Sequence, residues 1–191
     1  MTPPTPADVD SRRPLFFDTM GLSHFARADR LDVLRDLLVG RECWTTTVVR
    51  SELSAGARTH PNVGQTLTLD WIQIATLDAL EELSCFIKWA NRLGSQDRDL
   101  GEASVLAAAE LRDGTAITDD RDATKVARRY GADVHGTIWL LAGACRGGKL
   151  TPVAAGSIID ALRAEGARLP CTGSGFPAFA AHHGLMPPGT T

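Results

Sequence analysis

Acidic side chains recur at the points where predicted strands meet helices in this sequence. Asp18 follows the apolar run 15–17, Glu52 follows a second predicted strand, Glu102 opens a helix, and Asp119 and Asp120 end another strand. In a parallel sheet such junctions share one edge, so these carboxylates should meet there. Each close pair would cost ~1–4 kcal/mol unless a cation neutralises it, and Mg²⁺ or Mn²⁺ prefers such oxygen ligands. Phosphoryl transfer to water needs only carboxylates and such ions.

Each acid taken alone also has a structural explanation, so the argument depends on the set. Asp18 and Asp120 are suitable helix caps, and Glu52 and Glu102 would each gain ~0.3–1 kcal/mol from a helix dipole. The five histidines form no cluster, which disfavours zinc and iron. The sequence contains no serine nucleophile elbow, Walker loop or dinucleotide fingerprint.

Strands and helices alternate through most of the chain, which positions these acids. Apolar or β-branched runs predict strands at 15–17, 43–49, 71–75, 115–117 and 133–135, and helical spacing predicts helices at 22–39, 61–69, 77–93, 102–112, 122–130, 137–145 and 152–167. This order predicts an α/β fold, a three-layer α/β/α sandwich around a central parallel sheet. We expect a flexible leader over 1–14, the main domain over 15–150, and a C-terminal helix and Gly/Pro-rich tail over 151–191.

The bulk properties fit one globular domain. The 191 residues are 43% hydrophobic and 23% charged, and the net charge of −3 gives no overall basic character to indicate passive nucleic-acid coating. The four cysteines are widely separated and form no C-x-x-C pair, so we expect reduced, buried thiols. No apolar run reaches the ~20 residues of a membrane span, and the N-terminus does not read as a secretory signal. We expect a cytoplasmic location.

Short motifs along residues 15–150 resemble those of PIN-domain proteins, in particular the VapC-type toxin ribonucleases of VapBC toxin–antitoxin pairs. They are Phe17-Asp18-Thr19, the segment 48–53 with Glu52, Gly101-Glu102-Ala103-Ser104, Thr118-Asp119-Asp120-Arg121 and the segment 134–137. The resemblance implies Mg²⁺- or Mn²⁺-dependent cleavage of RNA, frequent homodimers and a small antitoxin protein that blocks the site. It implies that Asp18, Glu52, Glu102 and Asp120 form the acidic set, with Asp119 replacing or assisting Asp120 as a metal ligand.

Further positions are assigned around this set. The resemblance implies that the Thr118 hydroxyl orients the site, and Asp99 is a reserve ligand because many family members have Asp where this chain has Glu102. Basic residues near the acids in sequence are candidate phosphate contacts or ordinary surface residues: Arg50, Arg98, Arg121 and Lys125. The helices 22–39 and 77–93 could supply a dimer face. Two alternatives stay open, a module on the same fold that binds RNA or protein without cutting, and a DNA-directed nuclease.

Overall fold

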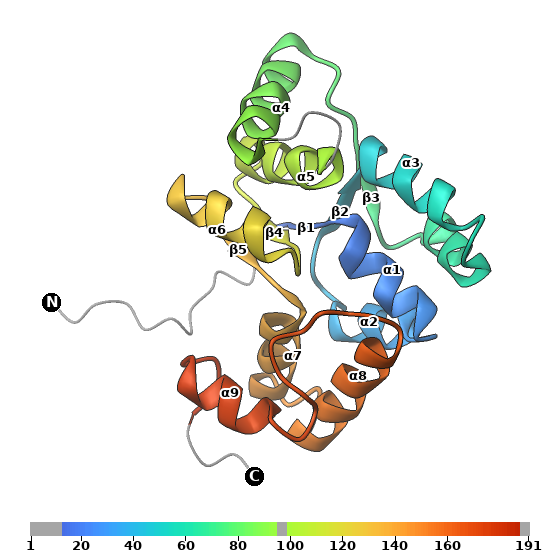
Figure 1. The fold of residues 1–191 in the computed structure, drawn as a ribbon, viewed down its shortest axis with the longest axis vertical. Helices are drawn as coiled ribbons and strands as arrows, with labels where there is room; N and C mark the ends of the chain where they lie inside the picture. The colour runs from blue at the N-terminus through green and yellow to red at the C-terminus, as the bar shows by residue number, and fades with distance from the viewer. Residues whose placement is uncertain (1–12, 95–98, 188–191) are drawn as a thin grey trace, which may run out of the picture.

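Five parallel strands form the central sheet of a computed structural model that describes residues 13–94 and 99–187 (Figure 1). The strands are β1 Leu15–Phe17, β2 Cys43–Thr46, β3 Gln73–Ala75, β4 Thr115–Ile117 and β5 Val134–His135, in the spatial order β3-β2-β1-β4-β5. All four pairings are parallel, and Phe16 of β1 lies between Trp44 and Ala116. The chain therefore reverses its direction of growth between β1 and β4, where α/β proteins keep their ligand crevices.

Helices cover both faces of this sheet, which gives the predicted three-layer α/β/α sandwich. The helical elements of the described chain are α1 Thr19–Arg27, α2 Leu31–Leu37, α3 Thr47–Gly56, the 3₁₀ helix η1 Pro61–Thr68, α4 Leu80–Leu93, α5 Leu100–Leu111, α6 Arg121–Arg129, α7 Thr137–Arg146, α8 Pro152–Ala164 and α9 Phe176–His182. In Figure 1, α4, α5 and α6 lie on one side of the strands, and α1, α2, α7 and α8 lie on the other. The side chains of β1 and α5 are almost entirely buried and form the centre of the core.

The second predicted strand is three residues too long. Residues 47–49 are β-branched and suit a strand, but β2 ends at Thr46 and α3 begins at Thr47. The Thr46 hydroxyl accepts the backbone N–H of Val49 at 3.2 Å, so Thr46 caps the helix and sets its start. Glu52 consequently lies in the second turn of α3.

The predicted helix over 22–39 is two helices. It begins earlier, at Thr19, because Asp18 caps it, and it breaks where Asp29 adopts a positive φ of 54°. Ala28 and Asp29 then separate α1 from α2, at the break that the sequence pattern indicates. The predicted 61–69 helix is the 3₁₀ helix η1.

The apolar stripe predicted on 77–93 is not the buried face of α4. Leu80, Leu83 and Ile87 are exposed, whereas Cys85 and Trp89 are buried against α5. The Trp89 indole N–H donates to Glu110 of α5 at 2.8 Å, and this contact turns the tryptophan face of α4 inward. A tryptophan with a polar partner thus sets the orientation of the helix against three aliphatic residues.

The C-terminal segment, which the sequence left unassigned after residue 169, contains α9 and packs on the domain. α8 contacts α7 and α1, and α9 contacts α8. Gly173 crosses directly over Gly156 of α8, and a Cβ atom at Gly156 would lie 2.8 Å from the Gly173 carbonyl oxygen. The Gly173 N–H donates to the Asp160 carboxylate at 2.7 Å, so two glycines and one aspartate fix the segment to α8.

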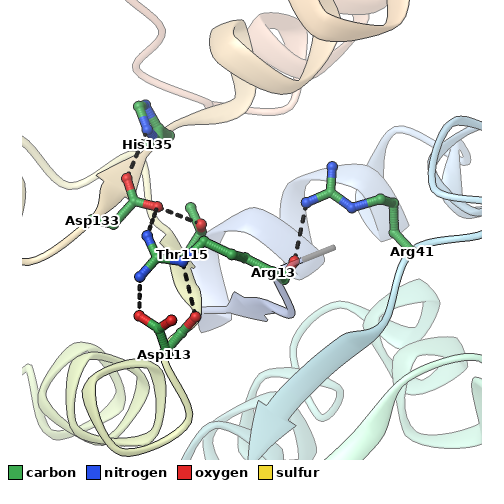
Figure 2. Close-up of polar contacts among 6 residues, drawn as sticks. All are labelled: Arg13, Arg41, Asp113, Thr115, Asp133 and His135. Carbon is green, nitrogen blue, oxygen red and sulfur yellow. Dashed lines mark hydrogen bonds and ion pairs between the residues drawn. The ribbon is translucent and has the colours of Figure 1, made fainter. Parts of the chain in front are cut away.

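A polar network fixes the amino-terminal edge of the sheet, opposite the predicted site. Figure 2 shows the Arg13 guanidinium between Asp113 and Asp133, with the Asp133 carboxylate also accepting the Thr115 hydroxyl at 2.5 Å. His135 contacts the other Asp133 oxygen at 3.0 Å. The hydrogen bond with His135 and that from Thr115 lower the pKa of Asp133 against the effect of burial. Residues 1–12 of the predicted leader lie outside the described residues.

Two predictions about exposure can be compared with this part of the chain. All four cysteines are free, as predicted, but only Cys43 and Cys85 are buried, and Cys145 and Cys171 are partly exposed. Within residues 13–94 and 99–187, the model contains no helix whose length and apolar character would suit a membrane span.

Candidate active site

Asp18 is a fully buried carboxylate at the carboxyl end of β1. One oxygen, Oδ1, accepts the Gly21 N–H at 2.6 Å and caps α1, and Oδ2 accepts the Thr118 hydroxyl at 2.5 Å. Burial raises the pKa of Asp18 from its ordinary value of 3.8 to about 8. The two hydrogen bonds oppose this rise, whereas the negative charges of Glu102 and Asp119 add to it.

Thr118 connects the ends of the two central strands. It follows β4 directly, and its hydroxyl donates to Asp18 and accepts the backbone N–H of Asp120 at 3.1 Å. The neighbouring backbone continues the sheet, because the Asp18 N–H donates to the Ile117 carbonyl at 3.1 Å. One buried side chain therefore fixes the distance between the β1 acid and the start of α6.

Glu52 joins three helices rather than pointing freely into a pocket. One of its carboxylate oxygens accepts the Thr19 hydroxyl of α1, and the other accepts the Gly101 N–H of α5 at 3.1 Å. A Cβ atom at Gly101 would collide with the Glu52 carboxylate, so glycine is required for this approach. Glu52 thereby holds the first turn of α5, where Glu102 lies.

Glu102 lies in that first turn and keeps part of its side chain exposed. Burial raises the pKa of Glu102, and the negative charges of Glu52, Asp99 and Asp120 raise it further. Like charges thus surround Glu102 on several sides. Asp99 is exposed at the N-cap of α5 with a positive φ of 59°, and its side chain makes no capping hydrogen bond.

A second hydroxyl pair supports the same turn from below. The Ser104 hydroxyl donates to the Gly101 carbonyl at 2.7 Å and lies 2.6 Å from the Thr46 hydroxyl. Both side chains are buried, so the end of β2 and the start of α5 are tied together beneath the acids.

The two adjacent aspartates after β4 have different partners. Asp119 accepts both the N–H of Thr137 at 2.8 Å and its hydroxyl at 2.5 Å, and so caps α7. Burial raises the pKa of Asp119, and the hydrogen bonds from Thr137 oppose that rise. Asp120 is exposed and caps α6 by accepting the Ala123 N–H at 2.7 Å.

The structure brings the predicted acids to the carboxyl edge of the sheet but does not close them around one point. Within residues 13–94 and 99–187, no three His, Cys, Asp or Glu side chains are placed to hold a metal ion. In the same part of the chain, no Lys, Arg or His forms an ion pair with Asp18, Glu52, Glu102, Asp119 or Asp120. The acidic group is therefore charged, partly buried and without a cationic side-chain partner there.

The predicted phosphate contacts have different surroundings. Arg121 and Lys125 of α6 line a cavity of about 440 Å³ that Thr118 and Asp119 also line. Arg50 instead borders a cavity of about 30 Å³ with no acidic lining residue. Arg98 lies outside the described residues.

Sequence reasoning gave no separate role to the residues that orient the acids. Thr19 and Thr137 each donate a hydroxyl to a site carboxylate, and Ser104 with Thr46 supports the turn before Glu102. The available signal was position, because Thr19 and Thr46 stand at strand-to-helix junctions where hydroxyl residues are preferred caps.

A parallel α/β sandwich with carboxylates at the carboxyl edge of its central strands defines a recognisable class of nuclease-like α/β proteins. A family model of this class, DUF3368, described as a PIN domain, matches residues 15–172. The chain belongs to this PIN-domain family, whose members are generally nucleases and typically use divalent metal ions. The match supports a nuclease activity. The search of curated proteins gave no match.

Proposed function

We propose that this protein is a metal-dependent endoribonuclease with Asp18 at its centre. The observation that carries the proposal is the fully buried Asp18 carboxylate, which receives the Thr118 hydroxyl and lies within the field of Glu102 and Asp119. A buried charge among like charges needs an opposite charge nearby, and no basic side chain of the described chain pairs with it. A divalent cation would supply that charge.

The donor set fits Mg²⁺ or Mn²⁺, because every candidate ligand is a carboxylate oxygen. Asp18, Glu102 and Asp120 would hold the ion, with Asp119 as an additional ligand. Glu102 and Asp120 keep exposed area, so rotation of these two side chains would bring their oxygens toward Asp18. When bound, the ion would neutralise charge on the scissile phosphate and acidify a water molecule.

The remaining residues would orient the reaction. Glu52 holds the Gly101 N–H and thus positions Glu102, and Thr118 holds Asp18 in one rotamer. A carboxylate that does not bind the ion would accept a proton from the attacking water. Arg121, beside Thr118 in the same cavity, would contact a substrate phosphate.

Cleavage of single-stranded RNA by Asp18→Asn tests this function. We expect the variant to lose Mn²⁺-dependent cleavage while it remains folded, and Asp70→Asn, at an exposed position, to cleave like the unaltered protein. Calorimetric titration with Mn²⁺ should show a saturable site that Asp18→Asn abolishes. Undiminished cleavage by Asp18→Asn would contradict the proposal.

Parallel digestions distinguish the alternative functions. Preferential cutting of single-stranded or flap DNA would make the protein a DNA-directed nuclease. RNA binding without any cutting, and without a Mn²⁺ site, would make it a binding module on the same fold.

We also propose a toxin role with a small antitoxin partner, on the strength of the motif resemblance to VapC-type proteins. Expression should arrest growth, and co-expression of a small DNA-binding protein encoded beside this gene should relieve the arrest. A homodimer is part of the proposal, and the exposed Leu80, Leu83 and Ile87 of α4 offer an apolar face for it. Light scattering would measure the assembly, and the cytoplasmic location stays a prediction.

A further inference from the structure

A cavity of about 440 Å³ opens directly beside the candidate active site. Thr118 and Asp119 line its inner end, and basic residues of α6 and of the segment after α8 line the rest, namely Arg121, Lys125, Arg128 and Arg168. Asp119 is the only acidic lining residue, and Thr137 donates to both of its oxygens. The cavity therefore has a strongly positive lining that begins at the acids.

The first basic side of the cavity is one face of α6. Arg121, Lys125 and Arg128 follow at helical spacings of four and three residues, which places them on the same side of the helix. They extend along about 10 Å of helix axis, at ~1.5 Å per residue. All three are exposed, and in the described part of the chain none forms an ion pair with an acid.

The second side comes from the C-terminal segment, and its geometry is fixed. Ala167 and Leu169 are buried, so the residue between them, Arg168, is held outward. The Ala167 N–H donates to the Leu162 carbonyl at 3.0 Å, and the Arg163 guanidinium donates to the Leu169 carbonyl at 2.9 Å. Arg168 thus occupies a packed position at the cavity and has no ion-pair partner among the described residues.

We propose that this basic groove, formed by Arg121, Lys125, Arg128 and Arg168, binds the phosphates of a single RNA strand that continues away from the cleavage site. The inference rests on the proposed function, because the acids at its inner end identify the ligand as a nucleic acid. Unpaired arginines suit phosphate oxygens, which accept two parallel N–H bonds from one guanidinium. Cations on two sides of a small cavity suit one strand, which a positively charged groove can follow, better than a duplex.

The contribution of the outer pair, Arg128 and Arg168, follows from counterion release. For single strands, log K changes with log salt by roughly 0.7 per phosphate contact, so two lost contacts reduce the slope by about 1.4. At about 0.1 M salt the same relation gives a loss of roughly 25-fold in affinity. Both side chains are exposed, so their replacement should leave the fold intact.

The experiment measures RNA binding rather than cleavage. A fluorescent single-stranded RNA is titrated by anisotropy in the presence of a chelator, over a series of salt concentrations, with Arg128→Gln/Arg168→Gln and the unaltered protein. The matched control is Arg58→Gln/Arg129→Gln, which removes the same charge at exposed positions outside the groove. We expect the loss in affinity and in salt slope for the groove variant only.

Several results would overturn this inference. They are equal losses for the two double variants, no loss for the groove variant, tighter binding of duplex RNA or of single-stranded DNA, binding of a poly-glutamate peptide in place of RNA, and no RNA binding by the unaltered protein. Failure of the groove variant to lose affinity would leave the Asp18 test unaffected, because that test measures cleavage. Loss of groove binding with an inactive Asp18 site would instead contradict only the nuclease proposal.

Discussion

Replacement of Asp18 by Asn should stabilise the metal-free protein, and the gain should grow with pH. The Asp18 side chain has no exposed area, and burial raises its pKa from 3.8 to about 8. A carboxyl with a higher pKa in the folded chain holds its proton more tightly there, so the free energy of unfolding falls as pH rises between these two values. Each pH unit costs about 1.4 kcal/mol, which gives roughly 2 kcal/mol at pH 5 and roughly 4 kcal/mol at pH 7.

Urea unfolding of both proteins in buffer with a chelator measures this gain. The amide of the Asn variant keeps an oxygen that can accept the Gly21 N–H, so the cap of α1 should survive. Asp70→Asn is the control at an exposed position, and we expect it to change the free energy of unfolding by less than ~0.5 kcal/mol. Destabilisation by Asp18→Asn, or a gain that is the same at low and neutral pH, would refute the reasoning. Added Mn²⁺ should reverse the order by stabilising only the unaltered protein.

Three further changes have outcomes that the structure specifies. Thr118→Val removes the hydroxyl that Asp18 accepts, a bond of about 1.5–3 kcal/mol, so RNA cleavage should slow by about tenfold or more, whereas Thr118→Ser should retain most activity in the same assay. Asp133→Asn should lower the free energy of unfolding by about 1–3 kcal/mol at neutral pH. Because the pKa of Asp133 is lowered in the folded chain, its contribution is present above 3.8 and is lost as the pH falls through the folded value, so urea unfolding in acid should show the difference disappear. Gly173→Ala forces a Cβ against a backbone carbonyl of α8 and should cost about 1–3 kcal/mol by thermal unfolding, whereas Gly143→Ala meets no close backbone atom and should cost less.

The elements around the acids could be predicted because their signals are local. An apolar run that stops at Asp18, and a helix whose first turn contains Glu102, place those residues without knowledge of the rest of the fold. The parallel order of strands then places the acids at one edge. Thr46 shows the limit, because its capping bond to Val49 ended a strand that β-propensity alone would have continued.

The partners of the acids could not be predicted because they come from distant positions. Asp119 is held by Thr137, and Glu52 by Gly101, across 18 and 49 positions of sequence respectively. The orientation of α4 likewise depends on the contact between Trp89 and Glu110. Side-chain hydrogen bonds of this kind are specified by the packed structure, so periodicity carries no signal for them.

The fixed position of Arg168 separates two tasks along the polypeptide. The acids stand on the alternating strands and helices, while this arginine stands on a segment attached to α8 through the Gly156–Gly173 crossing and the Asp160 carboxylate. Grafting a different sequence into residues 165–170 would therefore retarget the same hydrolytic machinery toward other strands without altering its reaction chemistry.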